Sequence, residues 1–184
     1  MNMNKKNLTI VALVAANAVA TLFATNNPMV GGARMYANKN IIQNAANSKD
    51  HTTLVAAVKA AGLVNTLEGK GPFTVFAPTN QAFEKLPAGT VEALLKPENK
   101  QKLAGILTYH VVPGKWTAES LMDKVKADGG STSIKTVNGE TLTAKLENGG
   151  VQLTDAKGGT AMVIIPDVMQ SNGIIFVIDT VLMP

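Results

Sequence analysis

Two different periods divide the pattern of hydrophobic and polar positions along the chain. In residues 50–62 the apolar side chains recur every three or four positions, as on one face of a helix that Asp50 would begin and Gly62 would end. Residues 141–146 instead alternate strictly between polar and apolar side chains, which is typical of a strand with one buried face. The pattern therefore predicts helices early in the chain and strands late in it.

Further elements follow from the same rules. Thr90 and Thr117 are suited to cap two helices, and Pro97 fits the first turn of another helix that would bury Leu103, Ile106 and Leu107. Apolar or alternating runs predict strands over residues 73–77, 151–154, 161–165 and 174–178, with Gly-containing turns at residues 138–139, 148–150 and 172–173. Because the helices cluster early and the strands late, we expect an α+β fold in which the helices of the N-terminal half pack on a β-rich C-terminal half.

The N-terminal residues have the layout of an export signal. Lys5 and Lys6 precede an uncharged apolar run over residues 8–24, which ends in small residues suited to cleavage. An uncleaved membrane anchor is the alternative, although seventeen uncharged residues are short for a span of about 20. We expect a secretory signal peptide over residues 1–24, a flexible Gly-containing tether over residues 25–39 and one globular domain over residues 40–184, in a secreted or periplasmic protein.

Composition and charge exclude several function classes. The 184 residues are 46% hydrophobic and contain no Cys, which rules out a disulfide scaffold, a thiolate metal site and a Cys nucleophile. The net charge is +4, and 15 basic against 13 acidic residues remain once Lys5 and Lys6 are set aside. No basic run is present, so the sequence does not favour nucleic-acid binding. The charge leaves open a weak attraction to an anionic cell surface.

Three segments in order resemble the fasciclin-like domain family, in its secreted bacterial single-domain type. They are residues 74–83 (TVFAPTNQAF), residues 109–114 (YHVVPG) and residues 171–184 (SNGIIFVIDTVLMP), so the resemblance covers residues 40–184. The closing block departs at Phe176, where the family often has His. A role that needs that imidazole is therefore absent here, whereas Phe suits a strand.

The resemblance implies adhesion or extracellular matrix interaction, with a surface protein or a polysaccharide as the partner. In animal relatives the Tyr-His region is implicated in integrin binding, which makes Tyr109 and His110 candidate partner-binding residues. Residues 166–169 (PDVM) resemble a second adhesion motif and make Asp167 a third candidate. Two of the candidates also have a structural interpretation: His110 as a buried, hydrogen-bonded imidazole, and Asp167 as a turn or helix-cap residue.

Catalytic and metal-binding signatures are missing from the sequence. It contains no Gly-x-Ser-x-Gly, phosphate-loop or His-Glu-x-x-His motif, and only two histidines, His51 and His110. We therefore expect a non-enzymatic protein without a metal or cofactor. The alternatives are a periplasmic binding module for a small ligand or polysaccharide, which needs a concave pocket; a hydrolase, which needs a Ser beside His110; and an envelope protein without a specific partner. Trp116 would cover the edge of the core or, if exposed, mark a contact surface.

Overall fold

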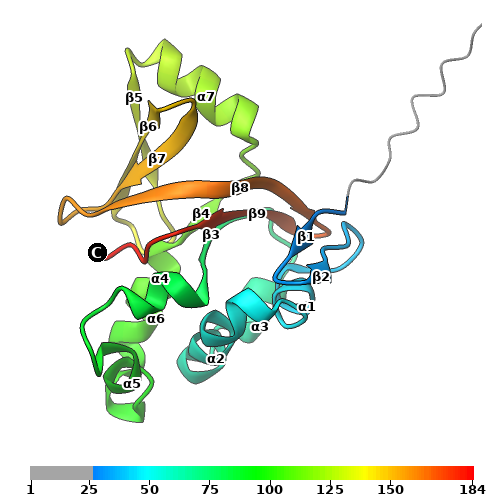
Figure 1. Cartoon of the computed structure of the whole chain (residues 1–184), viewed down its shortest axis with the longest axis vertical. Coiled ribbons are helices and arrows are strands. Elements are labelled where there is room, and N and C mark those ends of the chain that lie inside the picture. Colours follow the sequence, from blue (N-terminus) through cyan, green and yellow to red (C-terminus); the bar gives the residue numbers. More distant parts are fainter. Residues whose placement is uncertain (1–26) are drawn as a thin grey trace, which may run out of the picture.

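A curled sheet forms the centre of the domain (Figure 1). The helices of residues 41–109 gather below it as the helical base, and residues 118–154 rise above it as an arm that consists of one helix and strands of the same sheet. The computed structural model describes residues 27–184. The helices are α1 (Ile41–Ala45), α2 (Thr52–Ala61), α3 (Val64–Glu68), α4 (Asn80–Glu84), α5 (Thr90–Leu94), α6 (Lys100–Tyr109) and α7 (Ala118–Ala127), with 3-10 turns η1 (Lys49–His51) and η2 (Pro97–Asn99). The strands are β1 (Met29–Val30), β2 (Ala33–Arg34), β3 (Phe73–Pro78), β4 (Val111–Pro113), β5 (Ser131–Lys135), β6 (Thr141–Glu147), β7 (Gly150–Thr154), β8 (Thr160–Gln170) and β9 (Gly173–Ile178).

The main sheet has seven strands in the order β4-β3-β9-β8-β7-β6-β5. The β3–β9 pair is parallel, and every other neighbouring pair in this sheet is antiparallel. Just beyond β5, the Val137 N–H donates to the Val111 carbonyl of β4 at 2.8 Å. The two edges of the sheet therefore approach each other, and the curled sheet encloses a core of its own. This mixture of helices and sheet is the predicted α+β fold.

Strands β3 and β9 divide two hydrophobic cores. Ile175 and Val177 of β9 face the core shared with helices α1 to α6, whereas Ile174, Phe176 and Ile178 face the core inside the curled sheet. In the second core the Phe176 ring lies 5.6 Å from the Phe76 ring, at an interplanar angle of 46°. Both strands are buried on both faces, which explains why their sequences are continuous apolar runs without alternation. Phe176 therefore serves packing at the position where the family often has His.

The helix ends match the predicted caps in part. As predicted, Thr117 begins α7 with a capping box, and Gly62 ends α2 in the left-handed conformation at φ 73°. Thr79 caps α4 in the same way, through its side chain. The prediction for Asp50 was wrong, because this residue lies inside the 3-10 turn η1 that leads into α2. Thr90 is also not a cap: it is the first residue of α5, and Gly89 occupies the cap position with φ 79°.

The segment predicted as a flexible tether is structured where it is described. Strands β1 and β2 pair as a hairpin around Gly31 and Gly32, which both adopt positive φ as a tight turn requires. Val30 and Met35 are each only 3% exposed and belong to the helical core. The two glycines supply a turn instead of flexibility, because burial of the flanking apolar residues fixes the chain on either side. The predicted signal peptide lies outside the described residues.

Asn172, in the turn between β8 and β9, joins two helices of the helical layer to the sheet. Its Oδ1 accepts from the Ile41 N–H at 3.1 Å, and its Nδ2 donates to the carbonyls of Leu67 and Gly69 at 2.7 and 2.9 Å. The next residue must be Gly, since a Cβ at Gly173 would lie 2.0 Å from the Phe73 carbonyl oxygen. The turn thus fixes the sheet against α1 and the C-terminal end of α3.

Replacing Asn172 with Ala should destabilise the domain by about 3 kcal/mol, because the substitution leaves buried backbone donors and acceptors without partners. Urea-induced unfolding would measure the loss. The control is Asn47→Ala, which removes an exposed side-chain amide just beyond the end of α1. That amide donates to the Gln43 carbonyl, and its loss should lower the free energy of unfolding by less than about 1 kcal/mol. Equal losses in the two variants would contradict the role of Asn172 as a joint.

Candidate functional site

Tyr109 closes helix α6 with its side chain inside the sheet core. The residue has no exposed surface, and its hydroxyl donates to the Thr141 carbonyl at 3.0 Å while accepting from the Ala156 N–H at 2.9 Å. Burial raises the pKa of this phenol, so it remains a protonated donor. Tyr109 therefore ties α6 to β6 and to the turn after β7.

His110 is fixed just as firmly. Its Nδ1–H donates to the Ile106 carbonyl at 2.8 Å, and its Nε2 accepts from the Leu182 N–H at 3.0 Å. The Leu182 amide can only donate, so the ring must be the neutral tautomer that carries its proton on Nδ1. Burial lowers the pKa of His110 to about 4, which keeps the ring neutral in the native state.

The predicted partner-binding residues Tyr109 and His110 are both buried: His110 is only 2% exposed and Tyr109 is fully covered. The helix ends with both residues turned inward, toward the sheet and the C-terminal segment. His110 instead follows the structural interpretation, a buried imidazole with both nitrogens hydrogen-bonded. Trp116 is partly buried against the sheet core, as expected of a residue at the edge of the core.

Asp167 interrupts strand β8 as part of a bulge. Its φ of 55° lies in the left-handed region, and the pairing of β8 with β9 shifts register between Ile165 and Val168. Its Oδ1 accepts from the Ala118 N–H at 2.8 Å, at the first residue of α7. The partly buried carboxylate thus satisfies a free N–H at a helix N-terminus, where a negative charge is favourable. Asp167 therefore has a structural role at the start of α7, beside the Thr117 cap.

An apolar groove lies on the surface beside the Tyr-His segment. Its rim includes Thr108, which precedes Tyr109, and Val137, whose side chain is 44% exposed. The groove is shallow, with a cavity volume of about 20 Å³, and is lined by Leu63, Thr66, Leu67, Phe73, Thr108, Val111 and Val137. Sequence analysis missed Val137. The available signal was an isolated apolar residue directly before the Asn138-Gly139 turn.

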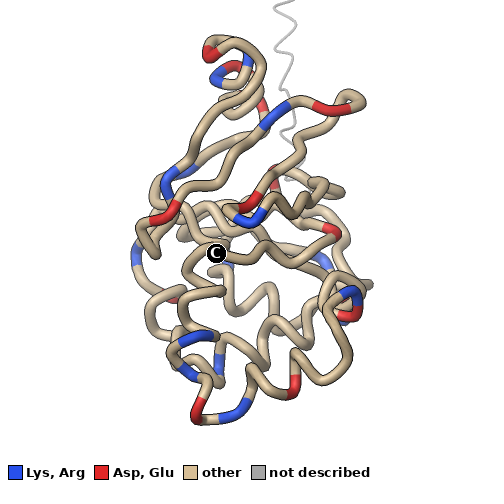
Figure 2. The backbone as a smooth tube through the Cα atoms, turned by 90° about the vertical axis from the view of Figure 1, so that its left-hand side faces the viewer, with Lys and Arg blue, Asp and Glu red and all other residues tan. Residues whose placement is uncertain are grey.

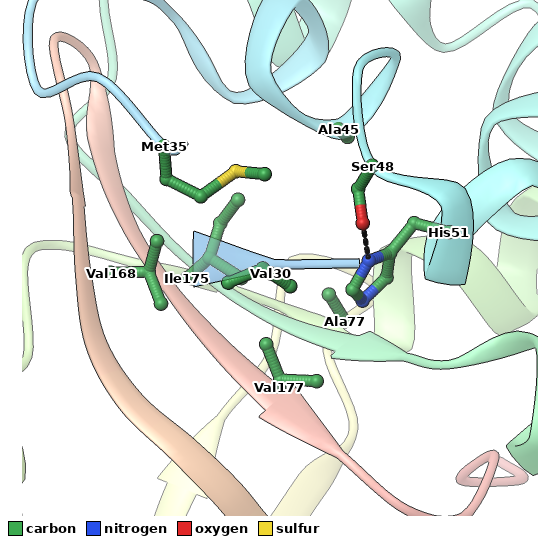
Figure 3. A pocket seen from close by; sticks show the side chains of 9 residues that line it. All are labelled: Val30, Met35, Ala45, Ser48, His51, Ala77, Val168, Ile175 and Val177. Atoms are coloured by element: carbon green, nitrogen blue, oxygen red, sulfur yellow. Dashed lines mark hydrogen bonds between the residues drawn. The ribbon is translucent and has the colours of Figure 1, made fainter. Parts of the chain in front are cut away.

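Ser48 and His51 form a hydrogen-bonded pair in a second cavity (Figure 3), with the Ser48 Oγ 2.9 Å from His51 Nδ1. Both residues are buried, and Val30 and Met35 from the N-terminal hairpin segment cover them. Within residues 27–184, His51 Nε2 has no hydrogen-bond partner, and burial lowers the pKa of the ring. The cavity holds about 10 Å³, which is no more than one water molecule needs. A substrate would have no access to this pair.

The geometry also bears on the alternatives. A hydrolase was expected to place a Ser beside His110, but backbone groups occupy both nitrogens of that ring. The apolar cavity between the helices and the sheet, lined by residues such as Ile41, Leu54 and His110, has a volume of about 30 Å³. Pockets for small ligands usually measure about 300 Å³ or more. The enclosed cavities therefore do not favour a small-ligand binding module.

Charges of both signs are interspersed over the helical base and the upper arm (Figure 2). The ion pairs are exposed, as for Lys124 with Asp128 at 2.8 Å and Lys85 with Asp179 at 3.5 Å. In residues 27–184 no group of three metal-ligating side chains occurs. Over the same residues, no helix is long and apolar enough to cross a membrane.

The stability of the domain should fall by about 3 kcal/mol as the pH decreases from 6.5 to about 4, because of His110. The unfolded chain binds a proton below pH 6.5, whereas the native ring does so only below about pH 4. The contribution of the neutral His110 to stability is therefore fully present above the pKa of the unfolded chain. It is lost as the pH falls toward the pKa of His110 in the native state. The lowered pKa of His51 acts in the same direction. Urea titrations at a series of pH values would measure the change.

The variant His110→Gln should be less stable than the parent at neutral pH but should show a flatter profile between pH 6.5 and 4. His51→Gln is the matched control, since it removes the other histidine and should keep most of the slope. A His110→Gln variant with the parent's full pH dependence would refute this assignment.

Comparison with known proteins agrees with this architecture. The fasciclin domain family model matches residues 49–184. The protein sll1483 of Synechocystis is 46% identical over 187 residues, which covers 94% of this chain and 97% of that protein. The immunogenic protein MPB70 of Mycobacterium bovis is 37% identical over 145 residues, covering 76% of this chain and 66% of MPB70.

A solved structure shares the fold. The FAS1 domain pair of the insect cell adhesion molecule Fasciclin I superposes with a TM-score of 0.69 at 21% identity, covering 79% of this chain and 51% of the pair. The family model spans the seven-stranded sheet, the core inside it and all three segments that carry the resemblance, so this chain belongs to the fasciclin domain family.

Proposed function

We propose that this protein is a non-catalytic adhesion or extracellular-interaction protein, which acts outside the cytoplasm through contacts on the surface of its fasciclin domain. Membership of the family is the first support. The similar solved structure comes from an insect cell adhesion molecule, and a relative 33% identical over 168 residues is the cell surface glycolipoprotein MPB83 of Mycobacterium bovis. The export-signal pattern of residues 1–24 agrees with a secreted or periplasmic location.

The groove beside Tyr109 and His110 is the contact surface in this proposal, and the exposed Val137 is the observation that carries it. An aliphatic side chain that is 44% exposed at the rim of an apolar groove gains from being covered by a partner. The buried Tyr109 and His110 act as positioning residues: they fix the end of α6, and with it Thr108 on the rim. The family motif thus serves binding through the surface that it holds in place.

Asp167 provides a second, polar contact in the proposal. One carboxylate oxygen is occupied by the Ala118 N–H, and the side chain is only partly buried, so the other oxygen is positioned to accept from a partner. The positive φ of this residue and the register shift around it interrupt the regular strand at this position. A surface protein or a polysaccharide fits such a combination of an apolar groove and a fixed acceptor.

A polysaccharide-binding periplasmic module is the second candidate. The open hollow between η1 and β8 favours it, because Asn80, Gln81 and Asp50 line this hollow with polar groups. Its volume is about 150 Å³, larger than that of any of the three apolar cavities. Against it, Asn80 already uses its amide to bind Lys49, Thr52 and Thr53. Adhesion through the apolar groove therefore has the stronger support.

Replacing Val137 with Glu should reduce specific attachment at least tenfold, because a charge in the groove must be desolvated when the partner covers it. The purified protein would be coated on beads, and attachment to cells of its own organism would be counted at low and physiological salt. Ile164→Glu is the matched control, since Ile164 is a comparably exposed aliphatic residue on β8, outside the groove. Because Ile164 borders the hollow of the second candidate, a loss confined to this variant would favour the polysaccharide-binding module. The control should attach like the parent.

Two results would overturn the groove as the contact surface. One is full attachment by Val137→Glu, and the other is an equal loss in both Glu variants. Attachment that disappears with salt in every variant would reduce the interaction to non-specific charge attraction. Circular dichroism and thermal unfolding would confirm that both variants keep the native fold.

A further inference from the structure

The positive charge of this protein is concentrated at its N-terminal end. Residues 1–49 contain five basic residues and no acidic one, because Asp50 is the first carboxylate in the sequence. Residues 50–184 contain the other 12 basic residues and all 13 acidic ones, so they carry a net charge of −1. Within the part that the structure describes, the excess belongs to Arg34, Lys39 and Lys49. The hairpin segment is thus the basic end of an otherwise nearly neutral domain.

The β1–β2 hairpin is amphipathic, with one face in the core and the other in solvent. Val30 faces the core, and Met35 just beyond β2 joins it there. Met29 and Arg34 are cross-strand partners on the opposite face, where Met29 is 54% exposed and Arg34 is also exposed. A pair in direct register places the two side chains next to each other. An apolar and a cationic side chain therefore project from the same patch.

Tyr36 extends this patch. Its side chain is 40% exposed, and the Lys39 Nζ lies over its ring, 5.1 Å from the centroid. The backbone beneath is rigid: the buried Asn44 accepts from the Tyr36 N–H at 3.0 Å and donates to the Tyr36 carbonyl at 2.8 Å. An open hollow bordered by Asn27 and Asn38 lies beside the ring. Met29, Arg34, Tyr36 and Lys39 form what we call the N-terminal face.

The position of this face in the chain matters as well. The described part begins at Asn27, which borders the same hollow as Tyr36. The preceding sequence holds the uncharged apolar run of residues 8–24, so this face directly follows the predicted export signal in the chain. Asp50, the first acidic residue, borders a different hollow, with Thr79, Asn80, Gln81 and Ile164.

From these observations we propose that the N-terminal face is a docking surface for an anionic phospholipid membrane. Arg34 and Lys39 pair with the lipid phosphates, while Met29 and the Tyr36 ring enter the interfacial region, where amphipathic aromatic side chains are favoured. Long cationic side chains can reach the phosphates while their stems lie along the apolar layer. An anionic polysaccharide would match the charges equally well but offers no apolar phase for Met29. The combination of side chains therefore favours the membrane.

The binding expected from such a face is weak and reversible. A basic residue near an anionic bilayer contributes about 1 kcal/mol, which corresponds to roughly a fivefold change in partitioning. Removing both Arg34 and Lys39 should therefore weaken binding by about 25-fold. Removing Met29 and Tyr36 should also weaken binding, and the binding that is left should depend more strongly on salt, because these two side chains supply the part that salt does not screen.

Vesicle co-flotation of residues 27–184 tests this proposal. These residues contain both hydrophobic cores and the whole seven-stranded sheet, and a cooperative thermal transition would verify folding before use. The vesicles are phosphatidylcholine alone or mixed with phosphatidylglycerol. The variant Arg34→Gln/Lys39→Gln is compared with Lys96→Gln/Lys102→Gln, which removes two exposed cations from the helical base. The two variants therefore have the same net charge. The parent should bind the anionic vesicles. The Arg34→Gln/Lys39→Gln variant should bind them about 25-fold more weakly, whereas the Lys96→Gln/Lys102→Gln variant should bind like the parent.

Insertion of the apolar side chains needs a separate readout. In the Trp116→Phe background, Met29→Trp would give a single Trp on the face, whose emission should shift to the blue and be quenched by brominated lipids. Equal loss in both double-Gln variants, or binding without any quenching, would overturn the proposal in favour of general charge attraction. Retention by beads carrying a sulfated polysaccharide, with no binding to anionic vesicles, would overturn it in favour of a polysaccharide site.

Discussion

The parallel pairing of β3 with β9 is the contact on which the rest of the structure depends. It joins Phe73–Pro78 to Gly173–Ile178 across about 100 residues of intervening chain, a separation whose closure costs substantial conformational entropy. Burial on both faces offsets that cost, since one face contributes to the helical core and the other to the core inside the curled sheet. The approach is close enough that Gly173 cannot carry a Cβ. Helices, arm and hairpin segment all take their positions from this pair.

The segments that identify the family are mainly the joints around this pair. Asn172 holds α1 and the C-terminal end of α3 to the β8–β9 turn. The Nε2 atom of His110 accepts from the Leu182 N–H, in the segment that follows β9. Asp155 secures the same C-terminal segment by accepting from the Met183 N–H at 2.9 Å. Buried polar groups of this kind must be fully paired, so few other residues can replace them. A motif that recurs in an adhesion family can therefore be structural in its side chains and functional only through the surface that it positions.

Sequence reasoning located the elements well and the side chains of the site poorly. Strict alternation revealed β6 and β7, and the Thr117 cap and Gly62 end revealed α7 and α2, because these signals are local. Which way Tyr109 and His110 point depends on where α6 meets β6 and the C-terminal segment, and no local period contains that information. The bulge at Asp167 and the hairpin at Met29–Arg34 were missed for a similar reason. Each is a short irregular segment that tertiary contacts fix: the Ala118 N–H in one case and burial of Val30 and Met35 in the other.

The two proposed surfaces gain strength from each other. A shallow groove of about 20 Å³ with one exposed aliphatic residue on its rim can supply only a weak contact, and a few cations on a hairpin do no better alone. Docking to a membrane, however, confines the domain to a thin layer and raises the effective concentration of its groove toward anything on the same surface. Many weak contacts then act together while each remains reversible. A small fasciclin domain with a basic, partly apolar N-terminal face can therefore hold surfaces together without a deep pocket.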